Sequence, residues 1–239
     1  ARRGQPGCHL RAPVGGGEPC MDFDQWRIIG DWLPELAGAA LVTVRITALG
    51  FALALALGTL LGIIRSRDSW LAYPVGAYVE FFRGTPLLVQ LFFIYYGLPQ
   101  VGVTLDAWTA GVVGLGLNGG AYIAEIVRGA LAGIDRGQYD AAHALGMGWP
   151  SVLAWVVLPQ ALRIATPPLV NSFASLLKES SLVSVLAITE IMNVAKMIYS
   201  RTFRAFEIYA VIALIYFVLT FAFSRLSRVL EKRMAMAQG

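Results

Sequence analysis

The chain has 239 residues, of which 57% are hydrophobic and only 14% are charged, and its formal net charge is +4. Soluble domains carry about 25% charged residues, so this chain has too few to cover a water-exposed surface of its size. Composition therefore excludes an ordinary soluble enzyme and a disordered chain as leading classes and favours an integral membrane protein. No cluster of lysine and arginine lies on a polar amphipathic segment, so we expect no nucleic-acid partner.

Residues 1–20 differ from the rest of the chain. They hold both cysteines, Cys8 and Cys20, together with five glycines and three prolines, and they lack the apolar core of a signal peptide. We expect an unstructured leader here that contributes +2 of the net charge, and Met21 has the look of a native start, which would make the leader foreign. The hydrophobic body after Met21 contains no cysteine for a disulfide, a thiolate metal site or a nucleophile.

A spanning helix needs about 20 mostly apolar residues, and five stretches meet this requirement. They cover residues 36–64, 84–105, 107–127, 164–189 and 208–224. The apolar stretch 149–162 is short and contains Pro150 and Pro159, which favours an interfacial or protein-buried segment. The predicted fold is an all-α integral membrane protein with five transmembrane helices.

The second predicted span contains a helix-breaking sequence, Gly84-Thr85-Pro86. Proline lacks a backbone donor and disfavours helical structure at the residue before it. Transporters often use such interrupted helices, whose freed backbone groups can face a substrate or an ion. The sequence therefore predicts an interrupted helix at this point.

Five spans place the two termini on opposite sides of the membrane. With the N-terminus outside, nine basic residues fall in cytoplasmic segments and four fall in outside segments after Met21, as the positive-inside bias requires. This orientation predicts an external N-terminal segment at 21–35, a transmembrane domain at 36–227 and a cytoplasmic tail at 228–239. The longest cytoplasmic connection, about 135–163, is predicted to hold a short helix that ends near Gly146 and Gly148, two glycines suited to a positive φ.

The sequence contains no recognisable catalytic or nucleotide-binding motif. None of its three lysines, Lys178, Lys196 and Lys232, lies in the Gly-Lys-Ser/Thr context of a P-loop. His9 and His143 form no metal-binding HExxH motif, and no GxSxG sequence is present. We expect a chain that is not an enzyme and holds no cofactor, so that any ATP used is bound by another subunit.

Several charged residues occur inside or beside the predicted spans, where each costs about 2.5–3.5 kcal/mol on insertion scales. Glu80 with Arg83, and Glu125 with Arg128, are i,i+3 neighbours that can pair for packing or can line a pathway. Lys178 and Glu179 are adjacent and diverge by about 100° on a helix. Because serine and asparagine side chains flank them, including Asn171, Ser172 and Ser175, we favour a cavity lining over packing between helices.

The long predicted cytoplasmic connection contains Asp140-Ala141-Ala142, followed by Gly146 and then by Leu158-Pro159. In residue types and spacing this segment resembles the EAA loop of ABC-transporter permeases, with Asp140 in place of the usual glutamate. Residues 83–92, 121–129 and 178–182 resemble three blocks of the polar amino-acid (His/Glu/Gln/Arg/opine) branch. Together the similar segments cover about residues 36–225.

The resemblance implies a type I ABC importer permease in a bacterial cell (inner) membrane. Its implied partners are two ATP-binding subunits that hold ATP and Mg, a second permease copy or paralogue, membrane lipids, and an extracytoplasmic solute-binding protein that delivers an amino acid. A cytoplasmic coupling helix would sit in a cleft of the ATPase subunit, with contacts from Asp140, Ala141, Ala142, Gly146, Leu158 and Pro159. Small alanines would allow close docking there.

A free amino acid carries an ammonium and a carboxylate, so its pathway needs both signs of charge or the dipoles of helix ends. Lys178 with Glu179, or Arg83 with Glu80, can supply them. The expected pathway residues are Glu80, Arg83, Gln90, Asn118, Tyr122, Glu125, Arg128, Asn171, Lys178 and Glu179.

Three other functions remain open at this stage. A secondary transporter driven by an ion gradient would use the intramembrane acids to carry protons. A membrane enzyme would need a catalytic constellation that the sequence lacks. A permease of the same superfamily could instead carry another small solute, such as an opine or a compatible solute.

Overall fold

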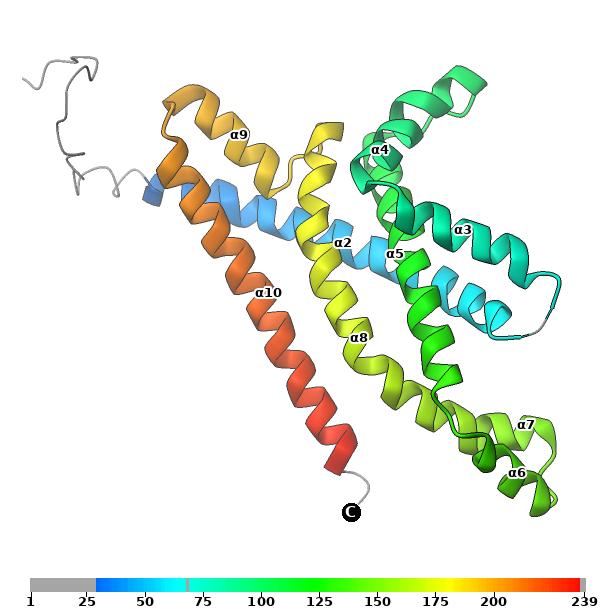
Figure 1. Ribbon diagram of the computed structural model, residues 1–239. Coiled ribbons are helices and arrows are strands. Elements are labelled where there is room, and N and C mark those ends of the chain that lie inside the picture. The colour runs from blue at the N-terminus through cyan, green and yellow to red at the C-terminus, as the bar shows by residue number, and fades with distance from the viewer. Residues whose placement is uncertain (1–28, 68, 237–239) are drawn as a thin grey trace, which may run out of the picture.

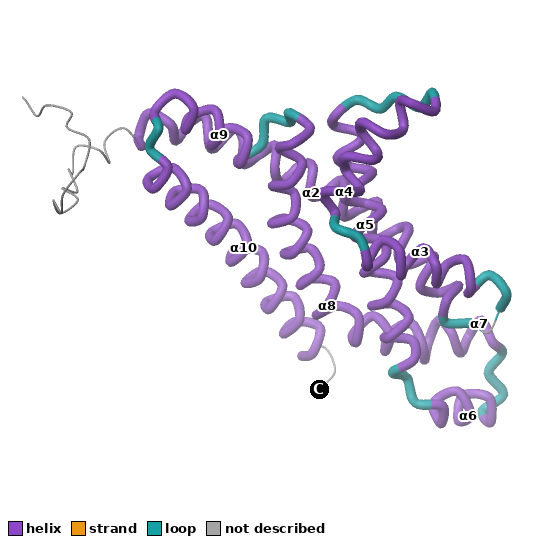
Figure 2. The backbone as a smooth tube through the Cα atoms, turned by 45° about the horizontal axis from the view of Figure 1, so that its top comes forward, coloured by secondary structure: helices purple, strands orange, loops and turns teal. Residues whose placement is uncertain are grey.

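The structure, a computed structural model, describes residues 29–67 and 69–236, and all regular secondary structure within them is helical (Figures 1 and 2). This confirms the predicted all-α class. The predicted leader, with Cys8 and Cys20, lies outside the described residues. The helices are α2 (Ile29–Arg65), α3 (Ala72–Gly84), α4 (Leu87–Phe92), α5 (Ala107–Ala132), α6 (Arg136–Ala144), α7 (Trp149–Val152), α8 (Leu158–Glu179), α9 (Ile191–Thr202) and α10 (Ala205–Met236).

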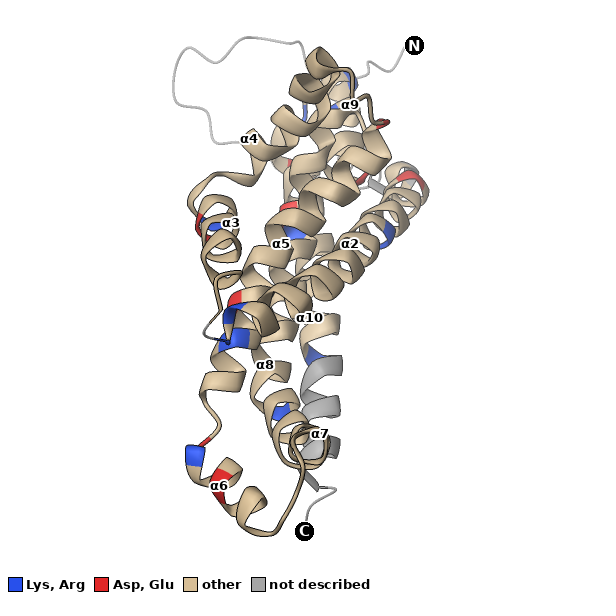
Figure 3. Ribbon diagram, turned by 90° about the vertical axis from the view of Figure 1, so that its right-hand side faces the viewer, with Lys and Arg blue, Asp and Glu red and all other residues tan. Residues whose placement is uncertain are grey.

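Within the described residues, four helical stretches are long and apolar enough to cross a membrane, and a bent pair of helices makes a fifth. The four are Trp32–Arg65, Ala107–Ala132, Trp149–Leu186 and Ala205–Arg225. Few charged residues lie along these helices, as the colouring in Figure 3 shows. The five predicted spans agree with this arrangement when the bent pair is counted as one.

The bent pair is the interrupted helix that the sequence predicts. The stretches Ala72–Gly84 and Leu87–Val101 meet at 106° (Figure 1). Thr85 is extended, with φ −115° and ψ 144°, because the following proline disfavours the helical conformation. The predicted span at 84–105 therefore begins too late, since α3 is a separate arm of the same bent element.

The prediction that 149–162 is separate from the fourth span is wrong. This stretch is continuous with α8, so one helical run extends over Trp149–Leu186. A π turn at Leu153–Val157 ends two residues before Pro159, which has no backbone donor. Most of the stretch is exposed, including Trp155, and only one side of it, with Val152 and Val157, is buried.

Close packing of α2 against α5 depends on two glycines one turn apart. A Cβ at Gly58 would lie 2.6 Å from the Cβ of Ile123 and 2.7 Å from the carbonyl oxygen of Gly120. At Gly62 it would lie 2.7 Å from the carbonyl oxygen of Ala124. This small-xxx-small spacing lets two backbones approach closely, as is common between membrane helices.

Helix α9 is not predicted from the sequence. It lies in the connection that is predicted to be external, between the last two spans. Its buried side chains, among them Ile191 and Ile198, pack with Leu36 of α2 and Ile208 of α10. Figure 1 shows α9 at the end of the molecule opposite α6. The helix therefore forms a cap over the ends of α2 and α10.

Glu190 fixes the start of α9 although it is fully buried. Its Oε1 accepts a hydrogen bond of 2.8 Å from the backbone N–H of Asn193, which caps the helix. Its Oε2 accepts one of 3.1 Å from the Tyr216 hydroxyl of α10, and the Thr43 hydroxyl of α2 lies 3.5 Å away. One carboxylate thus joins three helices.

We expect Glu190→Ala to lower the free energy of unfolding by about 1–3 kcal/mol, because it leaves buried donors without an acceptor. Burial raises the pKa of Glu190. Stability should therefore fall as pH rises from about 4.3, where the unfolded carboxyl titrates, to the raised pKa. Glu190→Gln should remove this dependence, and thermal unfolding of the purified protein at several pH values measures it. Exposed Glu35→Gln is the control. If Glu190→Gln kept the wild-type dependence of stability on pH, Glu190 would not be the group responsible for it.

Candidate functional site

A cavity of about 420 Å³ lies between α3, α5 and α8. A second cavity, of about 390 Å³, adjoins it at the break between α3 and α4. The two share Arg83, Asn118, Tyr122 and Glu179, so they form one continuous hollow. Its polar lining is completed by Thr85, Glu125, Asn171, Ser172 and Ser175.

The hollow is lined by charges of both signs. Arg83 lies in the last turn of α3, where the helix dipole favours a cation, and its guanidinium carbon is 5.5 Å from the centre of the Tyr122 ring. Glu179 is the last residue of α8 and lines both parts of the hollow. A molecule inside can therefore meet a cation and a carboxylate.

Spacing along α8 explains which of its residues reach the hollow. Pro168, Asn171, Ser172, Ser175 and Glu179 recur at three- and four-residue intervals and so share one face. Lys178 lies off this face, is exposed and does not line the hollow. The expectation that adjacent charges diverge is confirmed.

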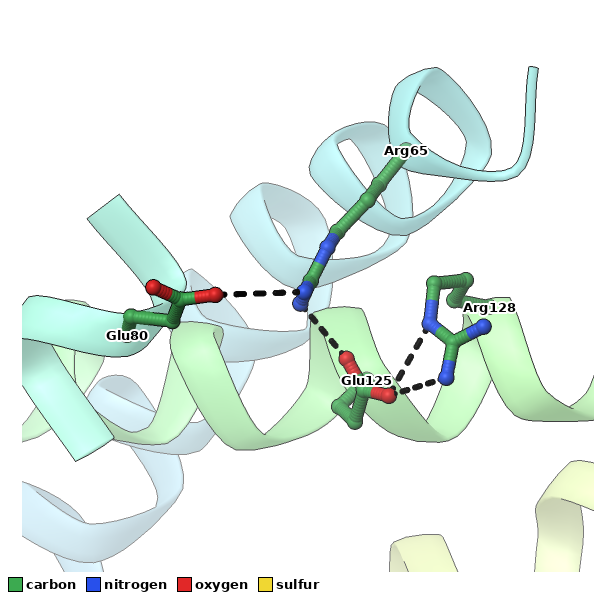
Figure 4. A network of polar contacts seen from close by, with 4 residues as sticks. All are labelled: Arg65, Glu80, Glu125 and Arg128. Atoms are coloured by element: carbon green, nitrogen blue, oxygen red, sulfur yellow. Dashed lines mark hydrogen bonds and ion pairs between the residues drawn. The ribbon is translucent and has the colours of Figure 1, made fainter. Parts of the chain in front are cut away.

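A network of four charged residues joins α2, α3 and α5 near the hollow (Figure 4). Arg65 of α2 donates to Glu125 of α5 at 2.6 Å, and Glu125 also pairs with Arg128. Arg65 lies 4.0 Å from the carboxylate of Glu80 on α3. The i,i+3 pairing is therefore confirmed for Glu125 and Arg128. For Glu80 it is wrong, because α2 brings Arg65 to that carboxylate.

The structure brings six of the ten expected pathway residues to the hollow and leaves four outside it. Those that line it are Arg83, Asn118, Tyr122, Glu125, Asn171 and Glu179. Glu80 and Arg128 line a separate pocket, Gln90 is buried behind the hollow, and Lys178 faces away. The charged residues that line the hollow are therefore Arg83, Glu125 and Glu179. Neither Arg83 with Glu80 nor Lys178 with Glu179, the two pairs considered from sequence, lines it together.

Thr85 belongs to the helix break that the sequence indicates could face a substrate, and the structure places it in the lining. Lining residues that sequence reasoning misses include Pro168 and the apolar residues Ile126, Leu176 and Leu182. Ser172 and Ser175 enter the sequence analysis only as part of a polar stripe, and their spacing to Glu179 is the signal that places them in the lining. The apolar wall residues carry no such signal, because every span of this chain is rich in similar side chains.

The predicted short helix in the cytoplasmic connection is α6, which stands apart between two loops in Figure 2. Asp135 caps it by accepting a 2.6 Å hydrogen bond from the N–H of Gly137. The positive φ expected at Gly146 is confirmed at +78°. At Gly148 the expectation is wrong, because that residue has φ −72° and begins α7 instead.

The two alanines of α6 face different ways. Ala141 is exposed, but Ala142 is only 4% exposed and packs against Ile134, Val152 and Val157. The expectation of a docking surface made by both alanines is therefore wrong. Ala142 fixes α6 to the chain's own α7 and π turn, while Asp140, Ala141 and Leu145 remain on the outer side.

Among the residues that the structure describes, no group of three or more His, Cys, Asp and Glu side chains could hold a metal ion. Arg45, the charged residue in the first span, is exposed and has no partner among these residues. The charged residues that could act on a solute are those that line the hollow and those of the network in Figure 4.

Comparisons with known proteins agree with this architecture. The glutamine transport system permease protein GlnP of Escherichia coli (strain K12) is 39% identical over 217 residues, which cover 90% of this chain and 99% of that protein. The L-cystine transport system permease protein TcyB of Bacillus subtilis (strain 168) is 37% identical over 203 residues, covering 84% and 87% respectively.

Two solved structures are similar in fold. The crystal structure of an amino acid ABC transporter with histidines matches with a TM-score of 0.82 and 37% identity, covering 90% of this chain and all of that one. The MetNI methionine ABC transporter matches in fold alone, with a TM-score of 0.73 and 18% identity, covering 85% and 98%. The family model described as "Binding-protein-dependent transport system inner membrane component" matches residues 26–236. The chain therefore belongs to this family of membrane-spanning transport subunits.

Proposed function

We propose that this permease carries a polar amino acid through the hollow between α3, α5 and α8, as part of an ATP-driven importer. The observation that carries the proposal is that Arg83 and Glu179 line the same hollow. A zwitterion that enters the hollow exchanges part of its hydration for contacts with the protein, and an opposite partner then stabilises each of its charges. Amide and hydroxyl groups from Asn118, Asn171 and Ser175 add neutral hydrogen bonds.

The relatives support the substrate class. GlnP is named for glutamine and TcyB for L-cystine, and the solved amino acid transporter was crystallised with histidines. These three amino acids share the ammonium and carboxylate groups and differ in the side chain. What the three share is thus one ammonium and one carboxylate group, and the charges of Glu179 and Arg83 are opposite to these.

The other subunits follow from what this chain lacks. With no P-loop of its own, it takes its energy from ATP and Mg bound by two ATPase subunits, which dock on the outer side of α6. An extracytoplasmic solute-binding protein delivers the amino acid, and a second copy or a paralogue completes the permease pair. The excess of arginine near α6 supports a cytoplasmic position for that end and an external N-terminus in a bacterial inner membrane.

Uptake by a reconstituted complex tests the role of the hollow. Glu179→Ala should lower the rate of amino-acid uptake about tenfold to a hundredfold, because one charge-assisted hydrogen bond of about 1.5–3 kcal/mol is lost. Lys178→Ala is the matched control, since the neighbouring residue faces away from the hollow and should keep uptake within about twofold of the wild type. Equal rates in both variants would contradict the proposed pathway.

The same preparation separates the alternative functions. A secondary transporter would take up solute without ATPase subunits when an ion gradient is applied, whereas the importer needs ATP and the binding protein. A panel of amino acids, opines and compatible solutes identifies the substrate class. Preference for a solute without both charges would overturn the assignment of Arg83 and Glu179.

A further inference from the structure

The break between α3 and α4 leaves a backbone carbonyl without its helical partner. In a continuing helix, the N–H of residue 86 would donate to the carbonyl of Phe82, but Pro86 has no N–H. Two side-chain amides donate to this oxygen instead. Nε2 of Gln90 lies 2.9 Å from it, and Nδ2 of Asn118 lies 3.2 Å from it.

These contacts fix which way both amide groups point. Nε2 of Gln90 also contacts the carbonyl oxygen and the hydroxyl of Thr85, at 3.0 and 2.8 Å. Carbonyl oxygens only accept hydrogen bonds, so the nitrogen of Gln90 must face them. Oε1 of Gln90 is then turned toward Asn118, from whose Nδ2 it accepts a hydrogen bond of 3.1 Å.

The two hydrogens of the Asn118 amide are thereby used within the protein, one on Phe82 and one on Gln90. What Asn118 has left to offer is its Oδ1, an acceptor. Both side chains are largely buried, Asn118 at 4% and Gln90 at 6% exposure, but Asn118 lines both parts of the hollow and Gln90 lines neither. Gln90 can therefore influence a solute only through its neighbour.

We propose that Gln90 is a positioning residue that acts through Asn118, and that it determines the polarity the hollow presents to its solute. By holding the Asn118 nitrogen away from the hollow, Gln90 makes Oδ1 the group that meets a donor of the solute. Without Gln90 the Asn118 amide can turn over and present its nitrogen, a donor, at the same place. The proposal rests on the proposed function, because it assigns a solute to the same hollow.

A double-mutant cycle on direct binding tests this coupling. The probe is radiolabelled L-glutamine, bound to the purified permease–ATPase complex without the binding protein, so that the Kd reports on the hollow. Gln90→Met keeps the volume of the side chain but removes its hydrogen bonds. We expect it to raise the Kd about tenfold, which corresponds to about 1.4 kcal/mol. Exposed Gln100→Met, ten residues further along, is the matched control and should leave the Kd unchanged.

The cycle is completed by Asn118→Ala and the double variant. If Gln90 acts through Asn118, the double variant binds no more than about twofold more weakly than Asn118→Ala alone, because the two effects are not additive. A purely structural role would lower the amount of folded complex without changing the Kd of what remains. Independent, multiplicative effects, or a normal Kd in Gln90→Met, would overturn the proposal.

Hydrogen–deuterium exchange keeps the inference separate from the proposed function. If the wild type binds none of a panel of amino acids, the proposed function fails, while the hydrogen bonds around the break can still be examined. Gln90→Met should then speed exchange in peptides covering residues 81–92 and 115–121 about tenfold, and Gln100→Met should not. Unchanged exchange in both segments would overturn the inference.

Discussion

Gly58→Val is expected to prevent stable assembly of the permease, with a loss of about 3 kcal/mol or more of folding free energy. A Cβ at this position would lie 2.6 Å from the Cβ of Ile123 and 2.7 Å from a backbone oxygen, so α2 would have to move away from α5. Such a movement would also separate Arg65 from Glu125, which join the same two helices. The yield of monodisperse protein in detergent and its thermal unfolding temperature measure the effect.

Gly38→Val in the same helix is the matched control. Within the part of the chain that the structure describes, a Cβ at Gly38 has no neighbouring heavy atom within 4 Å, so the same chemical change adds no clash there. The control should unfold near the wild-type temperature. Similar losses in both variants would mean that the β-branched side chain, and not the approach of α5, determines the result.

Ala142→Phe is expected to abolish coupled transport while leaving the protein in the membrane. The phenyl ring cannot fit among Ile134, Val152 and Val157, so α6 must leave its place, at a cost of about 1–3 kcal/mol. The variant should have a lower thermal unfolding temperature even without the ATPase subunits. It should also fail to bind them, which co-purification measures.

Ala141→Phe separates packing from docking. Ala141 is exposed, so a large side chain there should leave the unfolding temperature of the permease unchanged and still weaken co-purification of the ATPase. If Ala142→Phe unfolds normally, the inward packing of α6 does not control docking. Transport with normal ATPase stimulation in both variants would contradict a coupling role for this helix.

Features with a local cause could be predicted from the sequence. The break at Thr85 follows from Pro86 alone, and the caps and the positive φ of the α6 region follow from Asp135 and Gly146. The face of α8 that reaches the hollow follows from helical spacing. In each case the residue type and its immediate neighbours determine the conformation.

Features that depend on distant segments could not be predicted in the same way. Glu80 has a suitable partner three residues away, yet Arg65 reaches its carboxylate because α2 and α3 pack together. Ala142 could face either side of a short helix, and its inward position depends on Val152 and Val157 of the next element. The buried position of Glu190 likewise requires α2 and α10, which are remote in the chain.

Continuity of the chain from Trp149 to Leu186 has a mechanical consequence. The buried cluster around Ala142 attaches α6 to the first part of this helical run, and Glu179 lies near the other end of the run. The run can therefore transmit a movement of α6 to Glu179. Its stiffness is uneven, because the π turn and the adjacent Pro167 and Pro168 interrupt the regular hydrogen-bond pattern. Bending strain should concentrate at those points. Pro168 lines the hollow, so bending at this residue changes the width of the hollow. A force applied to α6 would therefore change that width before it displaced Glu179.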